Sequence, residues 1–371
     1  MNPARLVPPL LDWFVANARD LPWRCTHDPY AIWVSEIMLQ QTQVKTVLAF
    51  WERWMRELPT IHSLAKANPQ KIHKLWEGLG YYTRVRNMQK AARLIMARYG
   101  GQFPATFEDV LDLPGIGRYT AGAICSIAFN QPRPILDGNV IRVLTRVFGI
   151  DGSPKEKSVN VHLWHLAERL VESAAASAEI SNLKSQISNP RPKISNFKSQ
   201  ISNLNESLME LGALICIPRQ PNCHICPITR WCVARKQGRT EELPCRTERP
   251  VVTRRRFVAF ITHRKSKFLV QQRAAGVVNA HLWEFPNVEV SNDDGDPSKA
   301  AILIFGSSPS AMGKVCTIRH SITRYRIRLD VYQTAATNRM ARQQKNGRWC
   351  SRRELARLPF SSAHKKILAV L

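Results

Sequence analysis

The spacing of apolar residues predicts helices over most of residues 1–235. Near the N-terminus, Leu10, Leu11 and Phe14 recur at the spacing of one helical face. Further helices are expected at residues 30–41, 46–57, 61–66, 69–79, 87–99, 107–113, 120–129 and 141–172. This succession predicts a first domain that is all-α.

The pattern changes to that of strands after residue 253. Short apolar runs and one strictly alternating stretch lie at residues 257–261, 268–270 and 325–329. The first two runs predict a β-hairpin and the third a further strand. Helices are expected at residues 298–304, at 351–357 and at the C-terminus. The sequence therefore predicts an α+β domain over 253–371, joined to the first domain by a polar linker at 236–252.

The strand expected at 325–329 carries a row of arginines. Because side chains alternate across a strand, Arg324, Arg326 and Arg328 fall on one face. That face suits a phosphate backbone, and a solvated strand face is the plain alternative.

A repeat interrupts the helical domain. Four copies of a seven-residue unit begin at Ile180, Ile187, Ile194 and Ile201. Their apolar first and fourth positions have the form of a coiled-coil heptad. However, Pro190 and Pro192 break the pattern, and the many Ser and Asn residues are poor helix formers. We therefore expect an irregular, low-complexity insertion at residues 174–205.

The composition adds a strong positive charge. The 371 residues include 54 Lys and Arg against 28 Asp and Glu, which gives a formal net charge of +26. A surplus of this size favours a polyanionic partner, most simply nucleic acid, although a generally basic proteome would also produce it. No apolar run approaches the roughly 20 residues of a membrane-spanning helix. With no signal-peptide pattern evident, a cytoplasmic, nucleoid-associated protein without a membrane partner is expected.

Four cysteines lie close together after the insertion. Cys216, Cys223, Cys226 and Cys232 have six, two and five residues between them. Four thiolates in so short a span fit either a [4Fe–4S] cluster or a tetrahedral zinc ion. Zinc sites usually pair their ligands as two close couples, whereas this run holds only one Cys-x-x-Cys. The spacing therefore favours the iron–sulfur cluster.

Two glycines mark a turn between two expected helices. Gly115 and Gly117 stand in the sequence Leu-Pro-Gly-Ile-Gly, residues 113–117. Free N–H groups at the start of a helix attract anions, and glycine lets a phosphate approach the backbone closely. The stretch therefore indicates a nucleic-acid contact, with an ordinary helix–helix turn as the alternative.

Two carboxylates stand in apolar stretches. Glu36 is the only acid past the first turn of its expected helix, and Asp137 lies in the run Ile-Leu-Asp-Gly-Asn-Val. A carboxyl group in apolar surroundings has a raised pKa and can hold a proton near neutrality. The two residues are therefore candidates for acid and base, although Glu36 could also be a surface residue of an amphipathic helix.

Gln41 and Tyr81 are candidates for contacts with bases. The uncharged amide of Gln41 can bond base edges or fill the space of an extruded base. Tyr81 follows a flexible Gly-Leu-Gly turn and precedes arginines, so it can stack on bases or wedge between them. A core tyrosine beside surface arginines is the alternative.

Together these stretches resemble the MutY-type adenine DNA glycosylases of the helix-hairpin-helix, iron–sulfur base-excision superfamily. The resemblance rests on the four cysteines and on residues 33–43, 78–82, 113–117 and 135–139. It covers residues 10–235 apart from the insertion, and continues more weakly to the C-terminus. It implies a monomeric enzyme with a [4Fe–4S] cluster that removes adenine mispaired with 8-oxoguanine or guanine in double-stranded DNA.

The resemblance also implies roles for single residues. Glu36 would protonate adenine and later activate water, while Asp137 would stay ionised beside the deoxyribose. Tyr119 and Asn139 would support these two acids. Residues implied to contact DNA or the base are Leu21, Trp23, Arg24, Gln41, Tyr81, Gly115, Gly117, Glu206 and Thr323.

Tyr119 also bears on the type of glycosylase. Relatives of the endonuclease III type, which cleave the DNA strand, carry a nucleophilic lysine at this position. A tyrosine cannot form a Schiff base, so a monofunctional glycosylase is expected. The alternatives are an endonuclease III-like enzyme for oxidised pyrimidines and a catalytically silent DNA-binding protein.

The C-terminal domain resembles the family's Nudix-like domain, which recognises the lesion on the opposite strand. The long acidic helix of active Nudix hydrolases is missing, which argues against a nucleotide hydrolase. Where the family often has Phe-Ser-His, this chain has Ile322-Thr323-Arg324. Thr323 keeps a hydroxyl group, but the aromatic ring and the imidazole are absent.

Overall fold

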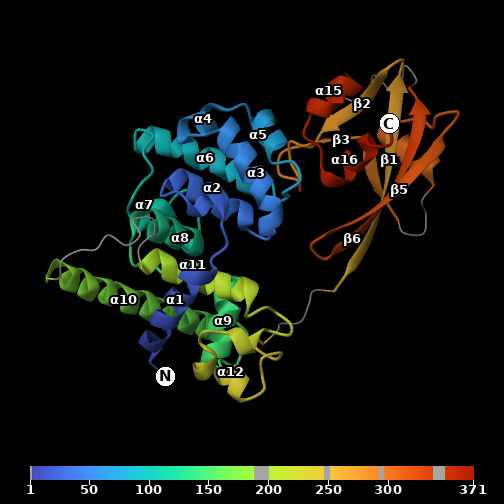
Figure 1. Cartoon of the computed structure of the whole chain (residues 1–371). Coiled ribbons are helices and arrows are strands. Elements are labelled where there is room, and N and C mark those ends of the chain that lie inside the picture. The colour runs from blue at the N-terminus through green and yellow to red at the C-terminus, as the bar shows by residue number, and fades with distance from the viewer. Residues whose placement is uncertain (1, 188–199, 246–250, 292–295, 337–346) are drawn as a thin grey trace. The chain divides into compact units, whose positions relative to one another are not determined.

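The computed structural model describes residues 2–187, 200–245, 251–291, 296–336 and 347–371 (Figure 1). The chain divides into two compact units. The first unit comprises Met1–Ala65 and Lys90–Glu248, and the second comprises Lys66–Gln89 and Arg249–Leu371. The boundaries at 235 and 253 stay a prediction, since the second unit also takes in a short segment of the helical half.

The first unit is built of helices. They are α1 (Val7–Asn17), α2 (Pro29–Leu39), α3 (Val44–Glu57), α4 (Ile61–Lys66), α7 (Phe107–Leu111), α8 (Arg118–Phe129), α9 (Gly138–Phe148), α10 (Lys157–Ile187), α11 (Gln200–Leu214) and α12 (Val233–Lys236). Most of these bounds lie close to those that the apolar spacing predicts, but the single helix expected at 141–172 is two helices, α9 and α10, separated by residues 149–156. Within the described residues, none of the helices is long and apolar enough to cross a membrane.

Side-chain caps fix where the central helices begin. The carboxylate of Asp28 accepts a hydrogen bond from the N–H of Tyr30 at the start of α2, and Thr106 accepts one from the N–H of Asp109 at the start of α7. Helix α2 is buried from Tyr30 to Met38, which makes it a central helix of the first unit. Such a position forces any polar side chain on α2 into the interior.

Helix α11 corrects the expectation of an irregular segment over residues 174–205. Its first turns, from Gln200, are buried rather than irregular, and the backbone of 174–187 continues α10. Residues 188–199 lie outside the described part of the chain. The prediction rested on helix propensity, and tertiary packing outweighs propensity here.

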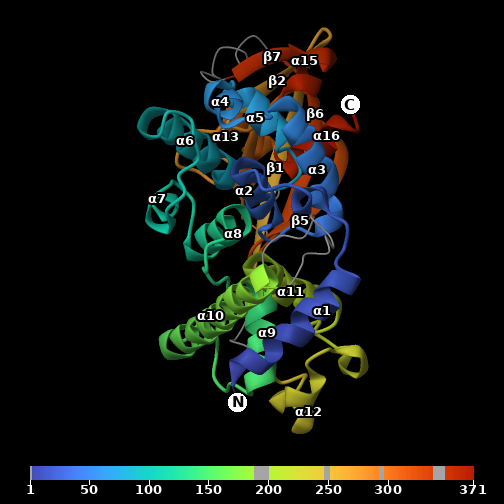
Figure 2. The same cartoon turned by 60° about the vertical axis from the view of Figure 1, so that its left-hand side comes forward.

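The packing of α11 explains this outcome. It contacts α1, α8, α9 and α10, as Figures 1 and 2 show. Ile201 and Leu204 are buried on it. The buried amide of Asn205 donates hydrogen bonds to Ser126 Oγ and to the Arg133 carbonyl oxygen, both at 2.9 Å. A residue disfavoured in isolated helices is thus stabilised by bonds that only the folded chain provides.

The second unit is organised on a mixed sheet. Its strands are β1 (Thr253–Arg264), β2 (Lys267–Gln272), β3 (Trp283–Glu284), β4 (Asn287–Val290), β5 (Gly313–Ile322), β6 (Tyr325–Ala335) and β7 (Gly347–Ser351). The order is β3-β2-β1-β6-β5, with β4 paired to β1 and β7 to β2. Strands β1 and β6 are parallel and the β1–β2 pair is antiparallel, so the expected hairpin and the α+β class are confirmed.

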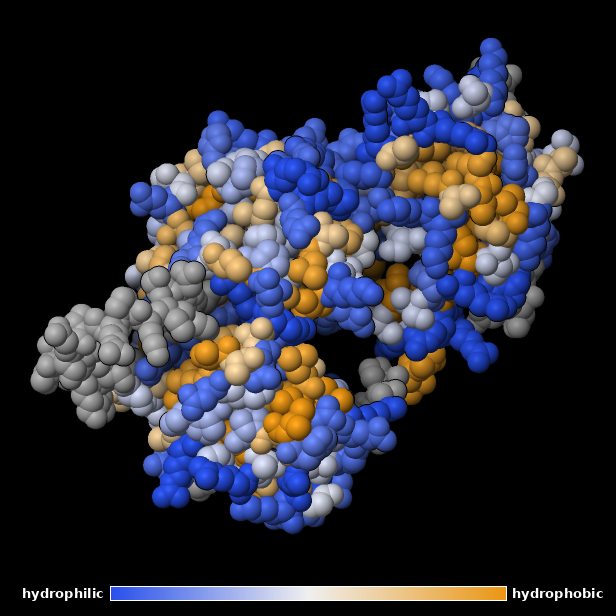
Figure 3. All heavy atoms as spheres, in the orientation of Figure 1, coloured by the Kyte–Doolittle hydropathy of each residue, from blue (hydrophilic) through white to orange (hydrophobic). Residues whose placement is uncertain are grey.

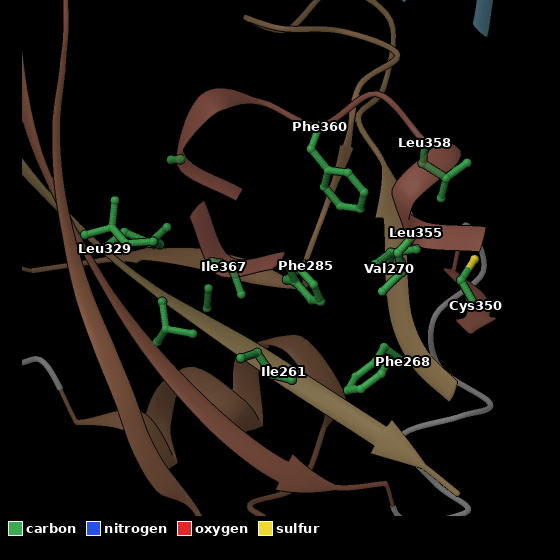
Figure 4. Packing of buried hydrophobic residues seen from close by; sticks show 14 residues of the cluster. Ile261, Phe268, Val270, Phe285, Leu329, Cys350, Leu355, Leu358, Phe360 and Ile367 are labelled. Carbon is green, nitrogen blue, oxygen red and sulfur yellow. The ribbon is translucent and has the colours of Figure 1, made fainter. Parts of the chain in front are cut away.

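Helices cover both faces of this sheet. On one face, α15 (Arg352–Arg357) and α16 (Ser362–Leu368) close a core that includes Ile261, Phe285 and Phe360 (Figure 4). On the other, α13 (Pro297–Phe305) packs Phe305 edge-on against Phe260, with ring centroids 5.5 Å apart. The second unit also contains α5 (Pro69–Leu75) and the start of α6 (Thr83–Arg98).

Candidate active site

A cavity of about 480 Å³ in the first unit is lined by acids from distant parts of the chain. Helix α2 contributes Glu36, the N-terminal end of α9 contributes Asp137, and α11 contributes Glu206 and Glu210; Tyr119 of α8 also lines it. Its volume is in the range of small-molecule sites. The two carboxylates that the sequence singled out therefore meet at one cavity.

Glu36 and Tyr119 are joined directly. The Tyr119 hydroxyl donates a hydrogen bond of 2.7 Å to Glu36 Oε2, and the side chain of Glu36 comes from the buried helix α2. Burial, and after it the charges of Glu36 and Asp137, raise the pKa of Tyr119 well above its usual value. The phenol therefore stays neutral and acts as a donor.

Asp137 caps helix α9. Its Oδ1 accepts the N–H groups of Asn139, at 2.9 Å, and of Val140, at 2.7 Å. Its Oδ2 accepts the side-chain amide of Asn139 at 2.9 Å. Burial raises the pKa of Asp137, and these bonds act in the opposite direction. The start of a helix is a favourable place for an anion.

Arg142, which the sequence did not single out, holds the partner of Asp137 in place. Its Nη2 donates to Asn139 Oδ1 at 2.8 Å and to the Gly212 carbonyl oxygen at 2.7 Å, and its Nε donates to the Cys216 carbonyl oxygen at 2.7 Å. The only sequence signal is its position three residues after Asn139 on one helix face.

A buried ion-pair network forms another wall of the cavity. Arg24 Nε lies 3.2 Å from Glu206 Oε1, and Arg24 Nη2 lies 2.9 Å from Glu210 Oε2. Arg19 donates two side-chain hydrogen bonds of 2.7 Å to Glu210. Burial acts to raise the pKa of Glu210, but the bonds from Arg19 and Arg24 lower it to about 2. No spacing in the sequence marks Arg19 or Glu210.

Several other expected residues also line this cavity. They are Leu21, Trp23, Gln41 and Asn139. Gln41 has a φ of 56°, in the left-handed region that non-glycine residues rarely occupy. Such a conformation is retained at functional positions when the surrounding structure enforces it.

The glycines of the hairpin are not among the lining residues. Gly115 turns the chain with a φ of 82°, and Gly117 precedes α8 without a side-chain cap. The first N–H groups of α8 therefore lack a side-chain acceptor at this cap, as the hairpin interpretation requires.

Tyr81 and Thr323 belong to the second unit. Both have left-handed backbones, with φ of 47° and 52°. The Tyr81 side chain is exposed, and the Thr323 hydroxyl donates to its neighbouring carbonyl oxygen on Ile322 at 2.7 Å. Both therefore lie at exposed turns, the kind of position from which a side chain can reach a ligand.

The four cysteines line a second cavity in the first unit. Beside it lies Arg146, 2% exposed, whose Nη1 is 3.4 Å from Cys216 Sγ. Its other hydrogen bonds go to the carbonyl oxygens of Leu243, Ile217 and Pro218. A buried guanidinium bonded to carbonyls and a thiol fits an anionic group between the cysteines.

Burial raises the pKa of the Cys226 thiol to about 12, and the three other cysteines act in the same direction. All four cysteines line this one cavity and are therefore gathered in one place. No group of His, Cys, Asp or Glu in the described ranges is already arranged as a metal centre, so the cluster itself is a proposal.

Two family models match the chain. Residues 34–169 match the HhH-GPD superfamily of base excision DNA repair proteins, and residues 257–370 match the NUDIX domain. The first match contains Glu36, Tyr119 and Asp137, and the second contains Thr323. The order of the two models agrees with the helical unit and the mixed sheet.

Comparison with individual proteins identifies the same family. The adenine DNA glycosylase of Rattus norvegicus is 42% identical over 63% of this chain, which spans only 43% of the rat protein. That of Buchnera aphidicola from Schizaphis graminum is 34% identical, over 76% of this chain and 74% of the relative. A solved thermostable thymine-DNA glycosylase matches 64% of this chain with a TM-score of 0.53 and 28% identity. The chain therefore belongs to the adenine DNA glycosylase family, MutY type, with a helix-hairpin-helix unit before a Nudix-like one.

Proposed function

We propose that the protein is a DNA N-glycosylase that removes adenine mispaired with 8-oxoguanine or guanine from double-stranded DNA, without cutting the strand. The observation that carries the proposal is the meeting of Glu36, Tyr119 and Asp137 at one cavity. Membership of the adenine glycosylase family supports it.

Adenine has to leave the duplex before it can react. Its glycosidic bond is inaccessible inside stacked DNA, so the nucleotide must be extruded into a pocket. Leu21 and Trp23 would contact the faces of the purine, while Arg24 and Glu206 would bond its polar edge. Gln41 and Tyr81 would occupy or open the vacated space in the duplex.

Glu36 would act as the general acid. Oε2 already accepts the Tyr119 hydroxyl, which directs the proton to Oε1. Transfer of that proton to a ring nitrogen makes adenine a better leaving group, and the electron pair of the C–N bond departs with the base. The carboxylate left on Glu36 then accepts a proton from the water that attacks the sugar.

Asp137 would stabilise the positive charge that grows on the deoxyribose as the bond breaks. This role requires the anion, and the N–H groups of Asn139 and Val140 favour the anion at the start of α9. In this scheme Glu36 carries the proton and Asp137 the charge, because the helix N–H groups bonded to Asp137 favour its anion.

Water is the proposed nucleophile. The residue after the hairpin is Tyr119, a neutral phenol that cannot form a Schiff base with the sugar. Strand cleavage by an amine is therefore not expected at this position. The endonuclease III-like alternative would require an amine there.

The four cysteines would hold a [4Fe–4S] cluster, in keeping with the buried charge of Arg146 beside them. When bound, the cluster supplies structural cross-links between residues 216 and 232. In this scheme the chemistry belongs to Glu36 and Asp137, and the cysteine loop supports the segment that Arg142 ties to Asn139.

The decisive experiment is single-turnover excision by a Glu36→Gln variant on a duplex with adenine opposite 8-oxoguanine, with and without alkali. Loss of the general acid is expected to slow excision by about 10²–10⁴-fold while DNA binding stays near the parent's. Glu172→Gln, an exposed change on α10, is the matched control. Excision by Glu36→Gln near the parent's rate would remove the residue from the mechanism, and strand breaks without alkali would favour the endonuclease III-like alternative.

A further inference from the structure

One face of the sheet in the second unit carries a cluster of cations. In the parallel pair of β1 and β6, Arg254 lies beside Arg326 and Arg256 beside Arg328; across the antiparallel pair, Arg319 of β5 lies opposite Arg328. Because side chains alternate along strands, these five arginines share one face. We call it the arginine face; Lys314 extends it.

A single carboxylate organises one end of the arginine face. Asp330 is fully buried, and its oxygens lie 3.0 Å from Arg256 Nη2, 3.0 Å from Arg328 Nε and 3.2 Å from Lys314 Nζ. It also accepts the Thr317 hydroxyl at 2.6 Å. One negative charge therefore serves three cations and leaves the cluster strongly positive.

The other members lack such compensation. Arg254, Arg319 and Arg326 are exposed, and no carboxylate among the described residues makes an ion pair with them. Like charges on directly opposed strand positions destabilise a sheet. The stability of the fold therefore does not explain why these arginines are placed together. Binding of an anionic ligand does explain it.

The arginine face continues the face that α13 covers. Val258 and Phe260, which follow Arg254 and Arg256 at alternate positions of β1, pack against α13. Beyond that helix the strands carry arginines instead of apolar residues, and Figure 1 shows the starts of β1 and β6 running on past α15 and α16. Figure 3 shows hydrophilic residues bordering the hydrophobic areas of the visible surface.

The chemistry of the cluster selects phosphate. Guanidinium groups bond phosphate oxygens through two parallel N–H groups, which an ammonium cannot do. Residues two apart on a strand lie about 6.6 Å from each other, and neighbouring strands about 4.8 Å, so the arginines form an array rather than a single anion site. An array suits a chain of phosphates.

We propose that the arginine face binds the phosphate backbone of duplex DNA, as a surface separate from the adenine cavity. The proposal rests on the proposed function only in taking DNA as the polyanion. It requires no base contact, so binding through this face is independent of sequence and damage.

The test is the salt dependence of binding to an undamaged duplex by the full-length chain, with Arg254→Gln/Arg326→Gln as the variant. Each lost phosphate contact lowers the slope of log K against log salt by about 0.9, so a decrease of about 2 is expected between roughly 50 and 200 mM salt. The affinity should fall about 10-fold near physiological salt.

The control Arg353→Gln/Arg357→Gln removes the same charge from exposed positions on α15 and should leave the slope unchanged. Arg254→Lys/Arg326→Lys should restore the slope and thereby exclude misfolding. An unchanged slope in the first variant, or an equal decrease in the control, would overturn the proposal. The proposal would also be overturned if Arg254→Gln/Arg326→Gln bound duplex RNA or phosphatidylglycerol vesicles more weakly than the parent but bound DNA equally well.

The salt slope is measured on undamaged DNA, and Glu36→Gln is measured on the mispair. Failure of the arginine face and failure of the proposed chemistry are therefore distinguishable.

Discussion

At the scale of single residues, the hydroxyl of Tyr119 connects the acid to the rest of the cavity. It is a neutral donor to Glu36 and is held among the charges of both catalytic candidates. Its position just after the hairpin was readable from the sequence, whereas its support of the acids was implied only by the family resemblance, because the bond to Glu36 joins residues 83 positions apart.

Tyr119→Phe removes this hydrogen bond without changing the shape of the ring. A hydrogen bond to the carboxylate that develops on Glu36 as its proton leaves contributes about 1.5–3 kcal/mol, so single-turnover excision should slow by about 10–100-fold while DNA affinity stays the same. Tyr99→Phe, which removes a hydroxyl bonded to Asp109, is the matched control. A parental excision rate in Tyr119→Phe would mean that the hydroxyl does not orient the acid.

Glu210 provides a stability prediction with a pH dependence. Its pKa falls from 4.5 in the unfolded chain to about 2 in the fold, so its contribution of about 3 kcal/mol is present above pH 4.5 and is lost as the pH falls toward 2. Glu210→Gln should therefore be less stable than the parent at pH 7, and the difference should shrink between pH 5 and 3.

Urea unfolding at pH 7, 5 and 3 measures this difference. Glu172→Gln, an exposed change on α10, should match the parent throughout. A deficit of Glu210→Gln that stays constant with pH would show that the ion pairs with Arg19 and Arg24 are not its source.

At the scale of elements, apolar spacing predicted most helices and the β1–β2 hairpin. Asp28 at the start of α2 and Thr106 at the start of α7 are local signals, and local chemistry determines them. The start of helix α11 was wrongly predicted to be irregular, because its Ser and Asn residues are stabilised by contacts with distant residues such as Ser126. Arg19, Arg142 and Glu210 escaped prediction for the same reason.

Helices α11 and α9 pack closely together at the site. A Cβ atom on Gly212 would lie 2.6 Å from Asn139 Cβ and 2.9 Å from its carbonyl oxygen, too near for any side chain. Gly212→Ala should therefore displace Asn139 and reduce excision by at least about 10-fold, since a shift of about 1 Å can cost 100-fold. Single-turnover kinetics on the mispaired duplex measure this reduction.

Gly313→Ala is the control, because nothing lies within 4 Å of a Cβ atom there. If folded Gly212→Ala excised adenine at the parental rate, the added methyl group would be accommodated without displacing Asn139 from its catalytic position.

At the scale of the whole molecule, we propose separate tasks for the two units: the helical unit would excise adenine, and the Nudix-like unit would read the opposite base. The Thr323 hydroxyl already gives its hydrogen to the Ile322 carbonyl, which leaves oxygen lone pairs to accept the N7–H that 8-oxoguanine has and guanine lacks. Thr323 is the residue of this turn that keeps a hydroxyl.

Thr323→Ala should lower the ratio of excision rates opposite 8-oxoguanine and guanine by about 3–10-fold, the effect of one neutral hydrogen bond. Excision opposite guanine should not change. The control is Thr253→Ala, because Thr253 is exposed at the start of β1. Thr317→Ala would not serve, because the Thr317 hydroxyl donates a hydrogen bond to Asp330. A parental ratio near one would mean that the second unit does not distinguish the two bases.

The position of α11 has a consequence for how this gene can change. The tandem unit that ends at Gln186 closes with Lys-Ser-Gln, as does the one that ends at Gln200. Replication slippage that excised residues 187–200 would therefore place an identical tripeptide before Ile201. The last unit, which begins at Ile201, supplies Glu206 to the adenine cavity, so only changes of copy number that keep this unit intact leave the cavity side chains of α11 unchanged.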